Sequence, residues 1–226
     1  MGSQKKKIEA YLDCVSPTSY LAFSYLTRRK QALQDLGVDL EFIPVFLGGI
    51  QTSSGNKPPW TLPAKAAYFS HDTPRALKYF GLKFTIPDFF PILSLVPQRC
   101  LTYVKIAIPD KLEPLFEACF ESMWVDHKDL SKAEHMLNAL QRVFDSREAE
   151  EILRKAQSPE IKQNLNDATS HAAGSLGAFG CPWFWVHDGN GNAGPFFGSD
   201  RFHYMWDYLD LPHRDLELDL TVHGKL

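Results

Sequence analysis

The sequence has no Cys-x-x-Cys pair, and its four cysteines lie far apart, at Cys14, Cys100, Cys119 and Cys181. This spacing argues against a zinc site and a disulfide-stabilised scaffold, so we expect an intracellular, reducing environment. The chain also has no apolar run of the roughly 18 residues that a membrane span needs, and residues 1–7 are too few for a signal peptide. The formal net charge is −3 with both signs interspersed. We therefore expect a small-molecule partner rather than a nucleic acid or a membrane.

Several motifs of common enzyme classes are also missing. The chain contains no G-x-x-x-x-G-K-[ST], no G-x-S-x-G and no H-E-x-x-H, and its eight histidines show no ligand-like pairing, so we expect no metal. A literal G-x-G-x-x-G lies within residues 188–194, but residues 195–197 continue as a strand where a dinucleotide site needs a helix. We interpret this run as a hairpin turn.

The first 47 residues have the pattern of a β-α-β unit. Residues 8–14 alternate apolar and polar side chains as a strand does, and Ser16 followed by Pro17 is typical of a helix start. The helix is expected to run to Gly37, and residues 38–47 to form a second strand. A helical crossover of this kind predicts two parallel strands with a right-handed connection.

The middle of the chain is predicted to be helical, from residue 60 to about residue 173. Apolar side chains recur at three- and four-residue spacing between residues 112 and 124, as on one face of a helix. Two further helix starts are expected, one at Ser131 with Glu134 in capping-box spacing and one at Ser158 followed by Pro159. No comparable strand pattern interrupts this region.

Strand character returns near the end of the chain. Residues 183–186 and 195–197 predict a hairpin, after which Gly198, Ser199 and Asp200 are expected to cap a last helix. The order βαβ, helices, ββα predicts an α/β chain whose thioredoxin-like domain is split by a large all-helical insertion. We assign residues 1–59 with 178–226 to that discontinuous domain and residues 60–177 to the insertion.

The junction of the first strand and helix carries Ser16-Pro17-Thr18-Ser19. Thioredoxin-like oxidoreductases place Cys-x-x-Cys there, because a helix N-terminus stabilises a thiolate. Serine occupies both cysteine positions here, which a plain helix cap would also explain. Cys181 and Pro182 open the returning strand, where such a fold places a cis-proline beside the active site.

Two further runs accompany these features, Ser-Gly-Asn-Lys-Pro-Pro at residues 54–59 and Gly-Ser-Asp-Arg at residues 198–201. With them the chain resembles the kappa-class glutathione transferases along nearly its whole length. The family motif Asp-x-x-Ser-Pro-x-Ser matches Asp13, Ser16 and Ser19. The resemblance implies a glutathione co-substrate, a homodimer, and a peroxisomal or mitochondrial location, with the cytoplasm not excluded. The terminal Gly-Lys-Leu is loosely similar to the peroxisomal address.

The resemblance also implies roles for individual residues. Ser16 would hydrogen-bond the glutathione sulfur, Lys65 would meet the glycyl carboxylate, and Asp200 with Ser199 would hold the γ-glutamyl end. The other residues expected at glutathione are Pro17, Thr18, Asn56, Cys181 and Pro182. The expected activity is conjugation of glutathione to small apolar electrophiles, with the aromatic-rich insertion lining their pocket.

Two residues depart from the family pattern and keep other functions open. Thr18 replaces a tyrosine, and Cys181 replaces an aliphatic residue beside the expected glutathione site. One alternative is a glutathione-dependent isomerase like the 2-hydroxychromene-2-carboxylate isomerases, which have a similar fold and serine. A second is a redox-inactive thiol-binding or chaperone-like module, and a third is a disulfide oxidoreductase that uses Cys181 alone.

Overall fold

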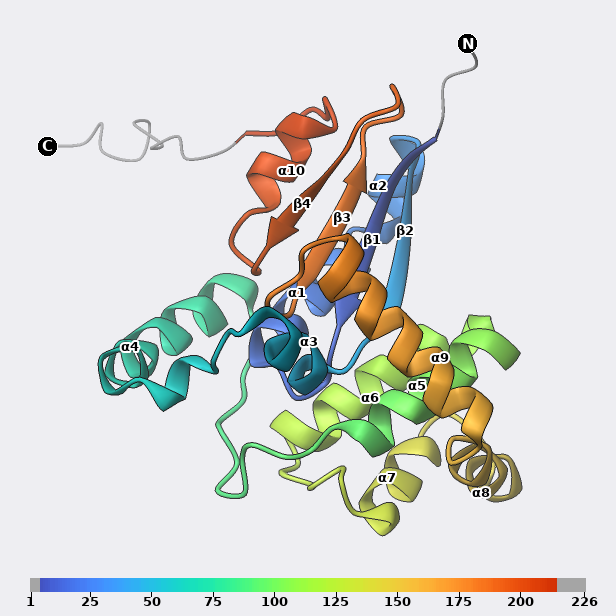
Figure 1. Cartoon of the computed structure of the whole chain (residues 1–226). Helices are drawn as coiled ribbons and strands as arrows, with labels where there is room; N and C mark the ends of the chain where they lie inside the picture. The colour runs from blue at the N-terminus through green and yellow to red at the C-terminus, as the bar shows by residue number, and fades with distance from the viewer. Residues whose placement is uncertain (1–4, 215–226) are drawn as a thin grey trace, which may run out of the picture.

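A four-stranded mixed sheet forms the centre of the molecule, in the order β2-β1-β3-β4. The structure is a computed structural model that describes residues 5–214. The strands are β1 (Lys6–Leu12), β2 (Val38–Pro44), β3 (Trp183–His187) and β4 (Ala193–Phe197). β1 pairs in parallel with β2 and antiparallel with β3, and β4 closes the predicted hairpin (Figure 1). Asp188 accepts hydrogen bonds from the backbone of Asn190 and Asn192, so the glycine-rich run is a turn, as predicted.

Helices cover both faces of this sheet. α1 (Pro17–Thr27), α2 (Lys30–Asp35) and α10 (Phe202–Tyr208) belong to the two β-containing halves. Phe42 of β2 and Phe184 of β3 flank Ala10 on one face, where their rings contact Phe23 of α1 and Phe202 of α10. In Figure 1, α9 crosses the opposite face.

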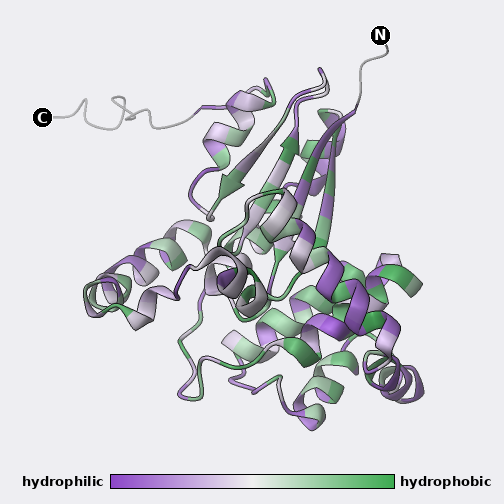
Figure 2. Cartoon of the chain, in the orientation of Figure 1, coloured by the Kyte–Doolittle hydropathy of each residue, from purple (hydrophilic) through white to green (hydrophobic). Residues whose placement is uncertain are grey.

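The helices between β2 and β3 confirm the helical region predicted from residue 60 to about residue 173, and α3 (Leu47–Ser54), which was not predicted, precedes it. They are α3, α4 (Pro63–Phe80), α5 (Leu95–Ala107), α6 (Leu112–Trp124), α7 (Ala133–Leu140), α8 (Ser146–Lys155) and α9 (Pro159–Ser170), with a π-helical turn at His171–Ser175. The charged side chains of α8 give it the most hydrophilic colouring, whereas α6 is largely apolar (Figure 2). The proposed domain boundaries remain a prediction.

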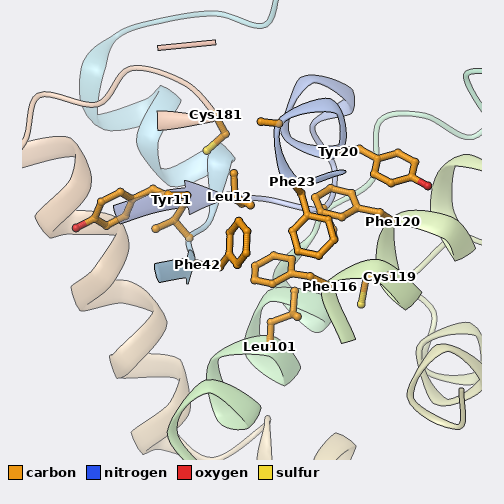
Figure 3. Close-up of a cluster of buried hydrophobic side chains, with 14 of the residues drawn as sticks. Tyr11, Leu12, Tyr20, Phe23, Phe42, Leu101, Phe116, Cys119, Phe120 and Cys181 are labelled. Carbon is orange, nitrogen blue, oxygen red and sulfur yellow. The ribbon is translucent and has the colours of Figure 1, made fainter. Parts of the chain in front are cut away.

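One hydrophobic core joins the insertion to the sheet. Figure 3 shows Phe116 and Phe120 of α6 beside Phe23 of α1 and Phe42 of β2. The Phe23 ring centroid lies 5.0 Å from that of Phe42 and 5.7 Å from that of Phe116. Because aromatic rings supply much of the apolar area that a core buries, this cluster fixes α6 against the sheet. The amphipathic helix predicted at residues 112–124 is thus confirmed, with its apolar face buried.

Three local predictions were wrong. The first helix ends at Thr27, because the Arg29 N–H bonds to Leu26 O at 3.0 Å, three residues back, and tightens the last turn. The second strand ends at Pro44 rather than residue 47. Ser131 does not cap α7, since its hydroxyl donates to Asp129 Oδ1. By contrast, Ser158 Oγ accepts from the Ile161 N–H, which confirms the predicted cap of α9.

Candidate active site

A cavity of about 880 Å³ opens between α1, α4, α10 and the loop before β3. It brings together eight of the nine residues expected at glutathione from the sequence. They are Ser16, Pro17, Thr18, Asn56, Lys65, Cys181, Ser199 and Asp200. The ninth, Pro182, is buried and does not line the cavity. Residues separated by more than 180 positions therefore share one concave site, which is the usual form of a small-molecule site.

The Ser16 hydroxyl lies at the N-terminus of α1, at one end of this cavity. Ser16 is the N-cap, and its Oγ accepts a hydrogen bond from the Ser19 N–H at 3.2 Å. The same oxygen donates to the Cys181 carbonyl at 3.0 Å and lies 3.0 Å from Thr18 Oγ1. Thr18 Oγ1 also donates to the Cys181 carbonyl, at 3.2 Å. One carbonyl therefore has two hydroxyl donors, so it keeps one if the other turns toward a ligand.

The Cys181 peptide and side chain have different surroundings. The Cys181-Pro182 bond is cis, as expected, and the Cys181 carbonyl points to Ser16. The side chain is buried among the core residues shown in Figure 3. Burial raises the pKa of the Cys181 thiol well above its usual value, and the charge of Asp13 adds to the increase. A reactive thiolate is thus disfavoured, which weakens the redox role that the sequence left open.

Asp13 lies buried at the end of β1, three residues before Ser16. Its carboxylate accepts hydrogen bonds from the Val15 and Leu47 N–H groups at 3.0 and 2.8 Å, and from Ser94 Oγ at 2.7 Å. Burial raises the pKa of Asp13 to about 6, although these hydrogen bonds act in the opposite direction. Asp13 therefore joins β1 to the first turns of α3 and α5.

Asn56 and Lys65 lie on the side of the cavity formed by the insertion. The Asn56 side chain is already occupied, because Nδ2 donates to Phe179 O and Oδ1 accepts from the Lys57 N–H, both at 2.8 Å. This amide joins the 54–59 loop to the segment before β3. Lys65 is exposed in the first turns of α4.

The predicted cap of the last helix was wrong. α10 begins at Phe202 with Arg201 as its N-cap, and no side chain there makes a capping hydrogen bond. Ser199 is buried beside the cavity, whereas Asp200 is exposed and forms an ion pair with Arg201. Because α10 has only seven residues, the dipole at its N-terminus adds little to anion binding beside Ser199.

Sequence reasoning missed an aromatic wall at the α10 side of the cavity, formed by Tyr25, Phe80, Phe202 and Trp206. The Tyr25 ring stacks on Phe202 with centroids 4.2 Å apart, and Phe202 stacks on Trp206 at 5.9 Å. The insertion supplies Phe80 to this wall and lines the cavity elsewhere with Trp60 and Phe69, as expected, whereas the other three residues of the wall come from α1 and α10. The four-residue spacing of Leu21 and Tyr25 after Pro17 was the available signal, since it places them on one face of α1.

Within residues 5–214, no helix is long and apolar enough to cross a membrane. In the same range, no group of three histidine, cysteine or acidic side chains is arranged to hold a metal ion. The loosely peroxisomal C-terminal tripeptide lies outside the described residues.

Comparison with known proteins agrees with this arrangement. Residues 7–210 match the family model of the DsbA-like thioredoxin domain. Two proteins named glutathione S-transferase kappa 1, from Caenorhabditis elegans and Homo sapiens, are each 30% identical to the chain. Each alignment covers 91% of this chain, and 92% and 91% of the respective relatives.

Among solved structures, a 2-hydroxychromene-2-carboxylate isomerase superposes with a TM-score of 0.71 at 20% identity. The superposition covers 90% of this chain and 94% of the isomerase, and it confirms the thioredoxin-like fold with its helical insertion. At 20% identity this similarity shows a shared fold and nothing more. The curated relatives are similar over nearly the full length in sequence as well, so the chain belongs to the kappa class of glutathione transferases, within the DsbA-like thioredoxin family.

Proposed function

We propose that this enzyme conjugates the glutathione thiolate to small apolar electrophiles, with the thiolate held by the Ser16 hydroxyl and the N-terminus of α1. One observation carries the proposal: the Ser16 hydroxyl faces the same cavity as Lys65, Asp200 and the aromatic wall. The tripeptide, its sulfur and an apolar second substrate can thus occupy one site. The kappa-class relatives support glutathione as the co-substrate.

The chemistry begins with ionisation of the thiol. A free thiol has a pKa of about 8.5, so only a few per cent is ionised at neutral pH. The positive end of the 11-residue helix α1 and one hydrogen bond from Ser16 both favour the anion. When Ser16 turns its proton to the sulfur, Thr18 Oγ1 still donates to the Cys181 carbonyl. Thr18, the departure from the family pattern, therefore lowers the cost of releasing Ser16.

The reaction itself needs no covalent enzyme intermediate. The thiolate sulfur donates an electron pair to the electrophilic carbon and forms a C–S bond, while a leaving group departs with its bonding pair. Apart from Thr18, no acid, histidine or other hydroxyl is described within hydrogen-bond distance of Ser16 Oγ to activate it as a nucleophile. We therefore assign Ser16 to stabilisation of the thiolate.

The charges around the cavity fit glutathione, which carries two carboxylates and one ammonium group. Lys57, Lys65 and Arg75 line the cavity, and none of the three makes a described side-chain ion pair or hydrogen bond. We assign Lys65 to the glycyl carboxylate. Asp200 would hold the γ-glutamyl ammonium, which requires it to exchange its exposed partner Arg201 for the ligand. Such an exposed ion pair is weak enough to be replaced.

The competing activities can be separated in one assay. We expect thiol consumption and thioether formation with a model aryl halide, and slower or no turnover of a chromene carboxylate or of a small disulfide. The buried Cys181 thiol is the reason to expect little disulfide reduction. Isomerisation of the chromene carboxylate without thioether formation would instead identify an isomerase. If glutathione binds but no substrate is turned over, the protein is a binding module.

We also propose a homodimer. Aromatic side chains of α4 support it, since Tyr68 and Tyr79 are 59% and 80% exposed in the single chain, as large apolar groups at an interface would be. Light scattering at micromolar protein should give about twice the 25.7 kDa chain mass. The monomer mass would contradict the proposal.

A further inference from the structure

A buried side chain of the insertion forms hydrogen bonds with the backbone segment that precedes Ser16. Gln98, in the first turn of α5, is fully buried. Its Nε2 donates to Leu12 O at 2.9 Å and to Val45 O at 2.7 Å, and its Oε1 accepts from the Cys14 N–H at 3.3 Å. Both amide donors and the amide oxygen are therefore used, and two of the three bonds go to the segment just before Ser16.

This amide acts where the parallel strands stop pairing. The β1–β2 register ends at Leu12 and Pro44, and beyond it the two chains separate toward Ser16 and α3. Gln98 bridges Leu12 and Val45 at this point, so its side-chain amide replaces the next peptide of the sheet. A glutamate of the same shape has no N–H donor for the two carbonyls. An apolar residue would leave Val45 O and the Cys14 N–H without the Gln98 bonds, whereas Leu12 O would keep its bond from the Val45 N–H at 3.1 Å.

Helix α6 contributes a second contact to the same segment. Trp124, the last residue of α6, donates its indole N–H to Cys14 O at 2.9 Å. The Cys14 peptide groups are thus bonded on both sides, by Gln98 and by Trp124. Ser16 N in turn donates to Asp13 O at 3.0 Å. The orientation of the Ser16 backbone therefore depends on how α5 and α6 pack against the segment between β1 and α1.

We infer that Gln98 and Trp124 are positioning residues of the transferase reaction, through which the helical insertion sets the direction of the Ser16 hydroxyl. The inference rests on the proposed role of Ser16. Neither residue reaches the substrate: Gln98 and Trp124 do not line the cavity that contains Ser16. Their contribution is to keep the hydroxyl and the first turn of α1 aligned on the sulfur, where small displacements reduce catalysis.

Two substitutions test this inference. Gln98→Glu keeps the shape and removes both donors. Trp124→Phe removes the indole N–H together with the five-membered ring and retains a buried aromatic ring. We expect each to raise the apparent pKa of bound glutathione by about half a unit or more, and to lower kcat about tenfold. The KM for glutathione should change little, because Lys65 and Asp200 lie on other elements. Trp124→Phe is the milder change and serves if Gln98→Glu does not fold.

Controls separate positioning from loss of stability. Gln163→Glu changes the same side chain on the exposed surface of α9, and Met136→Ala removes a buried side chain of α7 that makes no hydrogen bond to the Ser16 segment. Neither should move the thiol pKa. In a Ser16→Ala background, Trp124→Phe should produce no further loss of kcat, because it acts through the missing hydroxyl.

The outcomes also distinguish this inference from the proposed function. A folded Trp124→Phe protein with an unchanged thiol pKa and kcat overturns the inference, and so does full additivity with Ser16→Ala. In either case a shifted pKa in Ser16→Ala alone leaves the proposed function intact. If Ser16→Ala itself changes nothing, the proposed function fails first, and the inference fails with it.

Discussion

Ser16→Ala is expected to raise the apparent pKa of enzyme-bound glutathione by about one unit and to lower turnover at neutral pH by about tenfold or more. The substitution removes the only side-chain donor at the N-terminus of α1 that we assign to the sulfur, whereas the positive end of the helix remains. The thiolate loses one charge-assisted hydrogen bond but not its whole stabilisation. Ultraviolet absorbance of the thiolate, titrated against pH with saturating glutathione, measures the shift directly.

The fold should tolerate this change. Thr18 Oγ1 still donates to the Cys181 carbonyl, so only the Ser19 N–H loses its partner, at a cost of about 1 kcal/mol. Lys65→Ala is the matched contrast, because it should weaken glutathione binding while leaving the thiol pKa unchanged. A pH profile of Ser16→Ala that coincides with the wild-type profile would remove Ser16 from the mechanism.

Much of the fold follows from local sequence patterns. Alternation in residues 8–14 and the Ser16-Pro17 start were enough to predict β1 and the start of α1, because strand and helix periodicities differ and proline favours the first helical position. The strand itself lies two residues earlier than predicted, at Lys6–Leu12. The hairpin at Gly189 and Gly191 was predictable as well, because glycine is the residue that adopts positive φ most readily. In the structure both glycines do so, with φ values of 80° and 97°.

The errors lie where tertiary contacts replace local ones. The end of β2 depends on the Leu47 N–H, which bonds to the buried Asp13 carboxylate instead of continuing the sheet. The start of α7 depends on Asp129, which takes the hydroxyl expected to cap the helix. Neither competition can be seen in a sequence pattern, because capping rules describe one helix end at a time.

The site shows the same division. The motif around Ser16 and the 54–59 loop were visible in the sequence, and the structure places them at one cavity. The aromatic wall was not, because Tyr25 and Phe202 are 177 positions apart and meet only when α10 packs against α1. Gln98 and Trp124 were also missed, since their roles depend on carbonyls at strand ends rather than on any motif.

Asp13 gives the largest stability prediction, because its carboxylate is buried and its pKa in the folded protein is about 6 against an unfolded value of 3.8. Between those two values the folded state binds the proton more tightly than the unfolded state. Stability due to this group is therefore greatest in acid and declines as the pH rises through the folded pKa. Two units correspond to about 3 kcal/mol in total, of which about 2 kcal/mol falls between roughly pH 4.5 and pH 7.5.

Asp13→Asn should abolish this decline. The amide keeps one acceptor for the Leu47 or Val15 N–H but turns two hydrogens toward donors, so the variant is expected to be less stable at acidic pH. As the pH rises, the free energy of unfolding of the wild-type protein falls, whereas that of the variant does not change through this group, because Asn does not titrate. The difference in unfolding free energy between the two proteins should therefore narrow by about 2 kcal/mol. Urea unfolding at several pH values measures it, with Asp35→Asn, an exposed carboxylate on α2, as the control. Parallel pH profiles for wild type and Asp13→Asn would show that the Asp13 carboxylate titrates in the folded protein as it does in the unfolded chain.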